Sequence, residues 1–318
     1  MYITSLSKVK IMEDNKMLNY IKDVLENMPT GWLSLTTHRL DIYNEKLAKT
    51  QFLEQFETLF NNNNSESSVL SELPTAFDYI RLGHPLSSIL EWAIAKSNKL
   101  NPENVISFSS KTVPLLAILR KNLLDSKNTQ IVYARELPAS FDAEILRDIY
   151  GYKFELKKVE TVEEVSAFNG STVYISQQDE LCNFDLTSTV DFFINVHSHL
   201  GSILVVNGEQ NESYVSEIQH VRRRETISMT PANSLAALKV LIEKSAFTHQ
   251  KSNVETNKTL VLDSIAAITG SNTKALVASS GLSIQYAILM GLVHDALENH
   301  KGKAIKIVVP PNCYGGTN

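Results

Sequence analysis

Cysteine is scarce in this chain of 318 residues, and long apolar runs are missing. Its two cysteines, Cys182 and Cys313, are too few for a disulfide framework and lack the spacing of metal ligands. No apolar run reaches the roughly 20 residues that a membrane-spanning helix needs, and residues 1–10 lack the pattern of a signal peptide. We therefore expect a cytoplasmic protein with no membrane partner and an ordinary hydrophobic core.

Charge of either sign is not in large excess. The chain has 30 Lys and Arg against 35 Asp and Glu, which gives a formal net charge of −5. This balance offers no electrostatic reason to expect a nucleic acid as partner. The densest basic cluster, Arg222–Arg224, is followed by Glu225. We interpret this cluster as the solvated end of a helix or loop rather than as a phosphate-binding patch.

Several common catalytic and nucleotide-binding motifs are also missing. Neither Gly-x-Gly-x-x-Gly nor a Walker-type loop occurs, which argues against a dinucleotide or nucleoside triphosphate site. Ser279 and Ser280 lack the Gly-x-Ser-x-Gly elbow of a hydrolase. His197 and His199 form a His-x-His pair, but no Cys or carboxylate cluster stands beside them. We expect these histidines to lie at a helix end with a structural role, and we name no metal site.

What the chain does contain is 43% hydrophobic residues in alternating helix-like and strand-like segments. Residues 1–80 predict an N-terminal helical element, because apolar side chains recur at three- and four-residue steps. Residues 81–230 predict an α/β domain with a parallel sheet. Its expected strands are 105–109, 130–134, 153–159, 172–176 and 202–206, and its expected helices are 113–124, 141–150, 162–168 and 190–199.

Residues 231–318 begin as helices and then predict two more strands. Lys274–Leu282 has the pattern of a buried strand that breaks into small residues and opens a helix. Gly270 is placed to end the helix before it, and Ile305–Val309 predicts the second strand. Small residues between a strand and a helix leave backbone N–H groups pointing outward, which suits a phosphate. The alternative is that this is an ordinary strand-to-helix turn.

Part of this pattern occurs twice in the chain. Ile106–Lys111 is similar to Val277–Gly281, and Ser110 and Ser280 are 170 residues apart (280 − 110). At the same offset Asp125 meets Asp295. A period of this length indicates duplication of a whole α/β unit, while chance agreement among common residues remains the alternative.

The later copy resembles the pyridoxal-phosphate enzymes of cysteine and methionine metabolism, the transsulfuration family, which includes cystathionine gamma-synthase and cystathionine beta-lyase. Ala278–Leu282 and Cys313–Thr317 are similar to the family's Ser-Ser-Gly-Met and Tyr-Gly-Gly-Thr signatures, with one helix between them. The resemblance covers about the last quarter of the chain. It implies a fold type I, aminotransferase-like three-layer α/β sheet, and a homo-oligomer whose pockets are completed across a dimer.

The resemblance also implies roles for particular residues. Ser280, Gly281 and Leu282 would hold the phosphate of pyridoxal phosphate through backbone N–H groups, and Gly281 would allow close approach because it has no Cβ. Tyr314 would stack on the pyridine ring. The partner of the complete enzyme would be an amino acid, bound as a small-molecule substrate.

The departures from the family concern the catalytic groups. Pyridoxal phosphate chemistry needs a Schiff-base lysine and a carboxylate on the ring nitrogen, and neither can be named in this chain. In the earlier copy Asn207 would stand in the place of that carboxylate and Pro231 in the place of the lysine. Lys111 replaces the phosphate-loop glycine. If the duplication is real, the first copy is degenerate and binds no cofactor.

Two hypotheses follow from the sequence. In the first, the chain is the N-terminal portion of a pyridoxal-phosphate-dependent transsulfuration-type enzyme, a C–S lyase or gamma-synthase acting on sulfur amino acids. Residues 231–318 would then be the start of a truncated transferase domain, inactive alone because the Schiff-base lysine is missing. In the alternative, the chain is a noncatalytic scaffold or partner subunit that retains part of the cofactor pocket.

Overall fold

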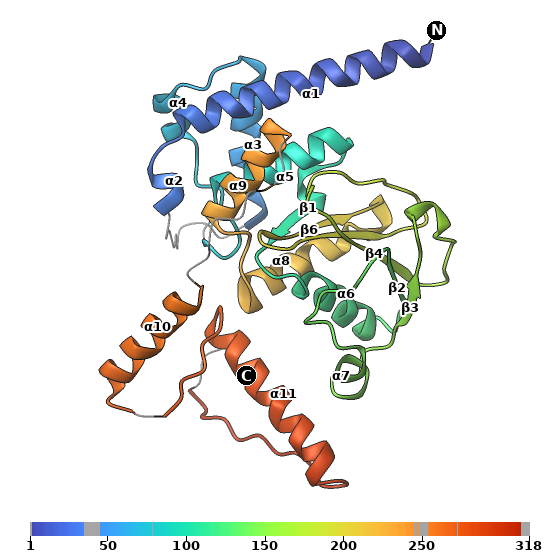
Figure 1. Cartoon of the computed structure of the whole chain (residues 1–318), viewed down its shortest axis with the longest axis vertical. Coiled ribbons are helices and arrows are strands. Elements are labelled where there is room, and N and C mark those ends of the chain that lie inside the picture. The colour runs from blue at the N-terminus through green and yellow to red at the C-terminus, as the bar shows by residue number, and fades with distance from the viewer. Residues whose placement is uncertain are drawn as a thin grey trace. The chain divides into compact units, whose positions relative to one another are not determined.

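The computed structural model describes residues 2–34, 45–77, 79–244, 247, 254–271 and 273–312. It divides into two compact units, residues 1–247 and residues 248–318 (Figure 1). Among the described residues, no helix has both the length and the apolar character needed to cross a membrane. The two units are described separately below.

A six-stranded sheet in the order β1-β6-β5-β4-β2-β3 forms the centre of the first unit. β6 runs antiparallel to both β1 and β5, and the pairs β5-β4, β4-β2 and β2-β3 are parallel. All strands except β6 therefore end at the same edge. The strands are β1 (Val105–Phe108), β2 (Thr129–Tyr133), β3 (Glu155–Lys158), β4 (Ser171–Gln177), β5 (Phe192–His197) and β6 (Gly201–Val206).

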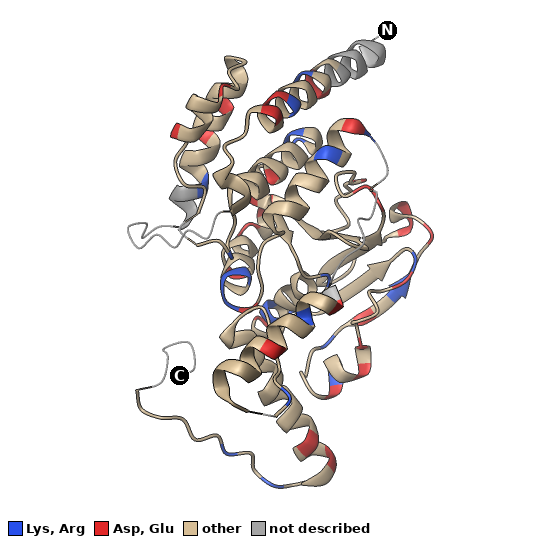
Figure 2. Ribbon diagram, turned by 60° about the vertical axis from the view of Figure 1, so that its left-hand side comes forward, with Lys and Arg blue, Asp and Glu red and all other residues tan. Residues whose placement is uncertain are grey.

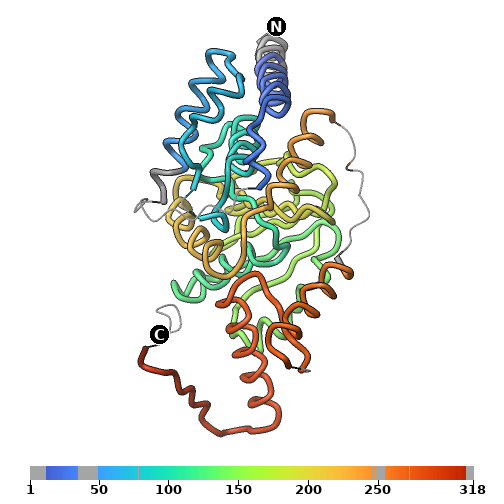
Figure 3. The backbone as a smooth tube through the Cα atoms, turned by 90° about the vertical axis from the view of Figure 1, so that its left-hand side faces the viewer, coloured from blue at the N-terminus to red at the C-terminus, as the bar shows by residue number. Residues whose placement is uncertain are grey.

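Helices cover both faces of this sheet, which confirms the predicted three-layer α/β fold class. α1 and α9 come from opposite ends of the unit and lie side by side, as the blue and orange tubes of Figure 3 show. One layer contains α1 (Tyr2–Asn27), α2 (Gly31–Ser34), α3 (Glu45–Asn61), α4 (Ser67–Glu72), α5 (Pro85–Asn98) and α9 (Pro231–Glu243). The other contains α6 (Val113–Leu124), α7 (Ala143–Asp148) and α8 (Ser213–Glu225). Short 3-10 turns are η1 (Pro102–Asn104), η2 (Val162–Glu164) and η3 (Glu209–Asn211).

The helix expected over residues 190–199 is wrong, because this segment contains strand β5. All six residues of β5 are buried, and they pair with β4 on one side and β6 on the other. Phe192 and Ile194 belong to the core on one face, while Phe193 belongs to the core on the other. A short apolar run buried on both faces has no helical or alternating period, so periodicity alone could not identify it.

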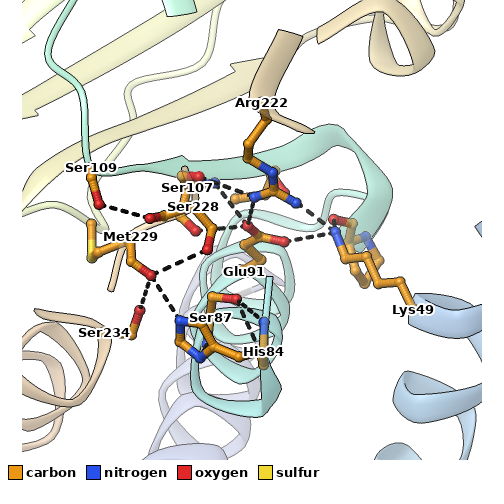
Figure 4. Close-up of polar contacts among 12 residues, drawn as sticks. Lys49, His84, Ser87, Glu91, Ser107, Ser109, Arg222, Ser228, Met229 and Ser234 are labelled. Carbon is orange, nitrogen blue, oxygen red and sulfur yellow. Dashed lines mark hydrogen bonds and ion pairs between the residues drawn. The ribbon is translucent and has the colours of Figure 1, made fainter. Parts of the chain in front are cut away.

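The outer edge of β1 is sealed by charged side chains instead of a neighbouring strand (Figure 4). Glu91 of α5 accepts the backbone N–H of Ser107 at 2.8 Å, and Arg222 of α8 donates to the Ser107 carbonyl at 3.0 Å. Arg222 also pairs with Glu91 at 2.7 Å, and Lys49 of α3 pairs with the other carboxylate oxygen at 2.9 Å. Lys49 further donates to the carbonyl of Pro102 at 2.9 Å. The edge therefore has its backbone groups satisfied without a further strand.

The interpretation of Arg222–Arg224 as a solvated cluster is wrong for Arg222. Its side chain is fully buried, as is that of Glu91. A triplet of arginines at a helix end predicts solvation only on average. Here the helical turn directs the first arginine inward to the carboxylate. Elsewhere, Lys and Arg are interspersed with Asp and Glu along the described chain (Figure 2).

Next to this edge, His84 holds the start of α5 against the loop before α9. Its Nδ1 accepts the N–H of Ser87 at 3.2 Å, so its Nε2 carries the proton that is donated to the Met229 carbonyl at 2.8 Å. This arrangement requires a neutral imidazole. Burial lowers the pKa of His84 from 6.5 to about 4, which agrees with that state.

The second unit contains α10 (Val254–Thr269) and α11 (Gly281–Asn299). Gly270 follows α10 with φ 63° and donates to the Ala266 carbonyl at 2.9 Å, which confirms that it ends this helix. The strands expected at the start of Lys274–Leu282 and at Ile305–Val309 are wrong, since neither segment is paired as a strand among the described residues. Val277 and Val308 are 57% and 94% exposed. An apolar run forms a strand only where a neighbour accepts its backbone hydrogen bonds, and the described part of this unit has none.

Replacing Glu91 by glutamine should destabilise the first unit by about 3–5 kcal/mol, because two buried cations lose their counter-charge. Urea unfolding followed by circular dichroism measures the change. Glu136→Gln is the matched control, since its pair with Lys158 is exposed and its loss should cost only about 0–1 kcal/mol. Equal effects of the two substitutions would contradict the role assigned to Glu91.

Stability should fall in two steps as the solution is acidified. Burial raises the pKa of Glu91, but the charges of Lys49 and Arg222 outweigh it and bring the pKa from 4.5 down to about 2. Both His84 and Glu91 bind protons more weakly in the folded state, so each contributes stability that is lost as the pH falls. We expect the His84 contribution to disappear between pH 6.5 and about 4, and that of Glu91 between pH 4.5 and about 2.

Urea unfolding at a series of pH values tests this pH dependence. His84→Asn, which keeps an acceptor for the cap but does not titrate, should make the first step smaller without changing the second, and the part that remains would come from His197, whose pKa burial also lowers. Stability that stays constant from neutral pH down to about pH 4 in the unmodified chain would contradict the account of His84.

Candidate functional site

The turn before α11 has the geometry of a capped helix start. Ser280 is the N-cap residue with extended backbone, φ −155° and ψ 161°. Its Oγ accepts the N–H of Ser283 at 3.0 Å, and the Ser283 hydroxyl accepts the N–H of Ser280 at 2.9 Å. The next two residues, Gly281 and Leu282, are the first of the helix, where N–H groups have no carbonyl partner within the helix. The turn can therefore present two backbone donors to an anion.

Gly281 has no packing reason to be a glycine. A Cβ built on it would have nothing within 4 Å, and its φ is not in the left-handed region. The described residues thus leave open space at the point where the two donors begin. Of the four candidate cofactor residues, the structure brings Ser280, Gly281 and Leu282 together at one helix start, while Tyr314 and Cys313 lie outside the described residues.

The first unit contains a turn with the same hydrogen bond. Ser110 Oγ accepts the N–H of Val113 at 3.1 Å, three residues further on, as Ser280 accepts that of Ser283. In both places a segment that is not α-helical separates two helices: η1 and β1 lie between α5 and α6, and residues 273–280 lie between α10 and α11. However, α6 starts at Val113 after the N-cap residue Thr112, which makes no side-chain cap bond, so the two helix starts differ and the duplication remains a prediction.

In the first unit, however, this turn is engaged by contacts within the chain. Lys111 Nζ donates to the Ser198 carbonyl at 2.6 Å, and Ser202 Oγ donates to the Ser110 carbonyl at 2.6 Å. Ser109 Oγ donates to the Ser228 carbonyl at 2.7 Å. The lysine that replaces the glycine therefore ties the turn to the β5–β6 hairpin. These contacts favour a structural role for the first turn.

The places proposed for Asn207 and Pro231 in the first copy are wrong. Asn207 directly follows β6, the one strand that runs against all the others, so it lies at the edge opposite to the Ser110 turn. Its amide donates to the carbonyls of Thr187 and Val190 at 2.9 and 2.6 Å. Pro231 begins α9 after the cap residue Thr230 and follows no strand. The sequence could not reveal this, because the direction of β6 depends on the unrecognised β5.

His197 and His199 lie in the β5–β6 hairpin and not at a helix end. His197 Nδ1 accepts the N–H groups of His199 and Leu200 at 3.1 and 3.2 Å. Burial lowers the pKa of His197, so the ring remains a neutral acceptor. Within the described ranges, no group of three or more His, Cys, Asp and Glu residues could hold a metal ion. The helix end expected for this pair is wrong, because His197 is the last residue of β5, where its ring accepts two backbone N–H groups of the hairpin.

Gly201 is a position that the sequence reasoning missed. Its φ is +122°, and a Cβ there would lie 2.1 Å from the backbone carbonyl oxygen of Phe108. Only glycine allows the hairpin to approach β1 this closely. In the sequence, Gly201 is the only glycine between two apolar segments. Its role can be recognised only once the hairpin is known.

Comparison with known proteins gives structural neighbours but no sequence relatives. No family model and no curated protein matches the sequence. Among solved structures, metB from Corynebacterium glutamicum is 16% identical with a TM-score of 0.34, over 54% of this chain and 55% of that chain. A cystathionine gamma-lyase from Lactobacillus plantarum, complexed with L-serine, is 12% identical with a TM-score of 0.33, over 52% and 54%.

A third neighbour is the cystathionine gamma synthase from Xanthomonas oryzae pv. oryzae, in complex with aminoacrylate and cysteine. It is 11% identical with a TM-score of 0.34, over 64% of this chain and 60% of that chain. The chain thus matches about half to three-fifths of the length of these enzymes. All three TM-scores are below 0.5, so the activities named for these enzymes are not transferred by superposition.

Proposed function

We propose that this chain is the N-terminal portion of a pyridoxal-phosphate-dependent transsulfuration-type enzyme, a C–S lyase or gamma-synthase acting on sulfur amino acids. The observation that carries the proposal is the capped turn at Ser280, with open space at Gly281, within a sequence similar to the family's phosphate-binding signature. Residues 231–318 would be the start of the cofactor-binding domain. The complete protein would be a cytoplasmic homo-oligomer with an amino-acid substrate and no nucleic-acid or membrane partner.

The residues of this turn fit the phosphate end of pyridoxal phosphate. The N–H groups of Gly281 and Leu282 would donate to phosphate oxygens, and the positive end of α11 would favour the negative charge. The missing Cβ of Gly281 lets the phosphate approach the backbone. Tyr314 would pack against the pyridine ring and fix its orientation. When bound, the cofactor supplies an electron sink for bonds at the amino-acid α carbon.

We expect this chain alone to be catalytically inactive. No lysine of the chain can be assigned to the Schiff base, and no carboxylate to the ring nitrogen. In the first unit Lys111 closes the corresponding turn, and we propose that this unit binds no cofactor. The same observation favours the second candidate function, a noncatalytic scaffold or partner subunit that keeps part of the pocket. The two candidates share the Ser280–Leu282 site and differ in whether a lysine joins it.

Binding of pyridoxamine 5′-phosphate tests the site directly, because this probe has no aldehyde and cannot react with surface lysines. We expect Gly281→Glu to weaken binding at least about tenfold, or about 1.4 kcal/mol, since its side chain and charge would enter the phosphate space. Gly291→Ala, in the middle of α11 and also free of close neighbours, is the matched control and should leave affinity unchanged. Isothermal titration calorimetry gives both values.

Pyridoxamine without the phosphate should bind much more weakly than its phosphate ester. Equal affinity for the two compounds, or unchanged affinity in Gly281→Glu, would contradict the assignment of this turn to a phosphate.

Reduction with borohydride in the presence of pyridoxal phosphate addresses the missing lysine. We expect only scattered, substoichiometric labelling, because no lysine can be assigned to the site. Peptide mass spectrometry measures the labelled positions. A single lysine modified one-to-one would overturn the expectation of an inactive chain and exclude the noncatalytic alternative.

A further inference from the structure

Besides the Ser280 turn of the second unit, the chain has another candidate site, which lies in the first unit. It is a cleft of about 420 Å³ at the carboxyl ends of β2, β3 and β4. β2 and β4 are adjacent and parallel, but their following connections go to opposite faces of the sheet. After β2 the chain enters α7, whose Leu146 packs in one layer, and after β4 it enters a loop whose Leu181 packs in the other. Such a divergence opens a crevice, and this is where α/β sheets bind ligands.

Aromatic side chains line this crevice. Tyr174 of β4 and Phe193 of β5 have ring centroids 6.0 Å apart at 63°, and Phe184 of the following loop meets Phe193 at 6.5 Å and 83°. Phe193 is buried, while Tyr174 and Phe184 are half-buried and border the cleft. The two outer rings therefore keep surface available to a ligand. The cleft volume lies within the range of small-molecule sites.

Carboxylates dominate the charge around these rings. Glu160, Glu163 and Asp185 line the cleft, against the single guanidinium of Arg135. Among the ion pairs of the described residues, none includes any of these three carboxylates. The pKa of Tyr174 is raised by burial and by the negative charges of Asp185, Glu163 and Glu164. The rings and the carboxylates thus line the same cleft.

We propose that this cleft binds a small organic cation, with the positive group between the aromatic rings and the carboxylates. An ammonium group over the face of an aromatic ring is attracted by the negative potential of that face, and the attraction grows when the site is partly desolvated. The carboxylates supply the counter-charge, while a phosphate would be repelled. The site therefore differs in ligand chemistry from the Ser280 turn, and neither proposal depends on the other.

Choline serves as the probe, and 3,3-dimethylbutan-1-ol is its neutral counterpart of nearly the same shape. We expect choline to bind with a dissociation constant of about 1 mM or lower, and the neutral alcohol at least about tenfold more weakly, by titration calorimetry at low salt. Absence of choline binding, or equal binding of the two compounds, would overturn the proposal.

Substitutions distinguish the contribution of the carboxylates to binding from that of the aromatic rings. Asp185→Asn and Tyr174→Leu should each weaken choline binding at least about threefold, while Tyr174→Phe, which keeps the ring, should retain it. Asp148→Asn is the charge control, because Asp148 is exposed on α7 and does not line the cleft. Thermal unfolding of each variant confirms that the chain is folded. Equal losses for Asp185→Asn and Asp148→Asn would show a general charge effect and contradict the site.

Discussion

The buried carboxylate of Glu91 is the interaction on which the first unit depends. A sheet edge that is covered by helices must still satisfy its backbone N–H and C=O groups. At β1 this is done by Glu91 from α5 and Arg222 from α8, which reach Ser107 from opposite layers, with Lys49 from α3 completing the charge balance. One carboxylate thus joins both helical layers to the same strand. It also prevents another strand from pairing at that edge.

A second important region of the first unit is the end of the sheet at which strands β1 to β5 terminate. Here the first unit has closed the turn that resembles a phosphate site, through Lys111 and the hairpin that Gly201 permits. The second unit has a turn with the same serine-to-backbone hydrogen bond, but glycine stands where Lys111 stands in the first. The Ser110 turn is tied to the β5–β6 hairpin through Lys111, whereas a Cβ on Gly281 would meet no described atom within 4 Å. Our functional proposal places the cofactor at the second for this reason.

Much of the fold could be predicted from the sequence, because β1, α6, β2, β4 and β6 each have a clear local period or turn signals. β5 could not, since six residues buried on both faces carry no period that separates strand from helix. The error spread to Asn207, because an unrecognised strand reverses the direction assigned to the next one. Arg222 was missed for a different reason: its partner Glu91 lies 131 residues away, and the pairing exists only in the fold.

The candidate site, like the fold, could be predicted from the sequence only in part. Ser280 and Gly281 could be predicted because a helix cap and a missing Cβ are local features. The strands expected on either side of α11 depend on neighbours that the second unit does not contain among its described residues, so no local pattern could decide them. The cleft beside Tyr174 could not be foreseen at all, since its rings and carboxylates come from strands β4 and β5 and from the two connections that follow β3 and β4.

The central claim is that the two serine turns differ in their ability to bind an anion. The most direct test is a titration of the isotopically labelled chain with inorganic phosphate, followed by nuclear magnetic resonance of the backbone amides. Our account predicts saturable shifts of the Gly281 and Leu282 amides and none for Lys111 and Thr112. Shifts at Lys111 and Thr112, or none at either turn, would contradict it.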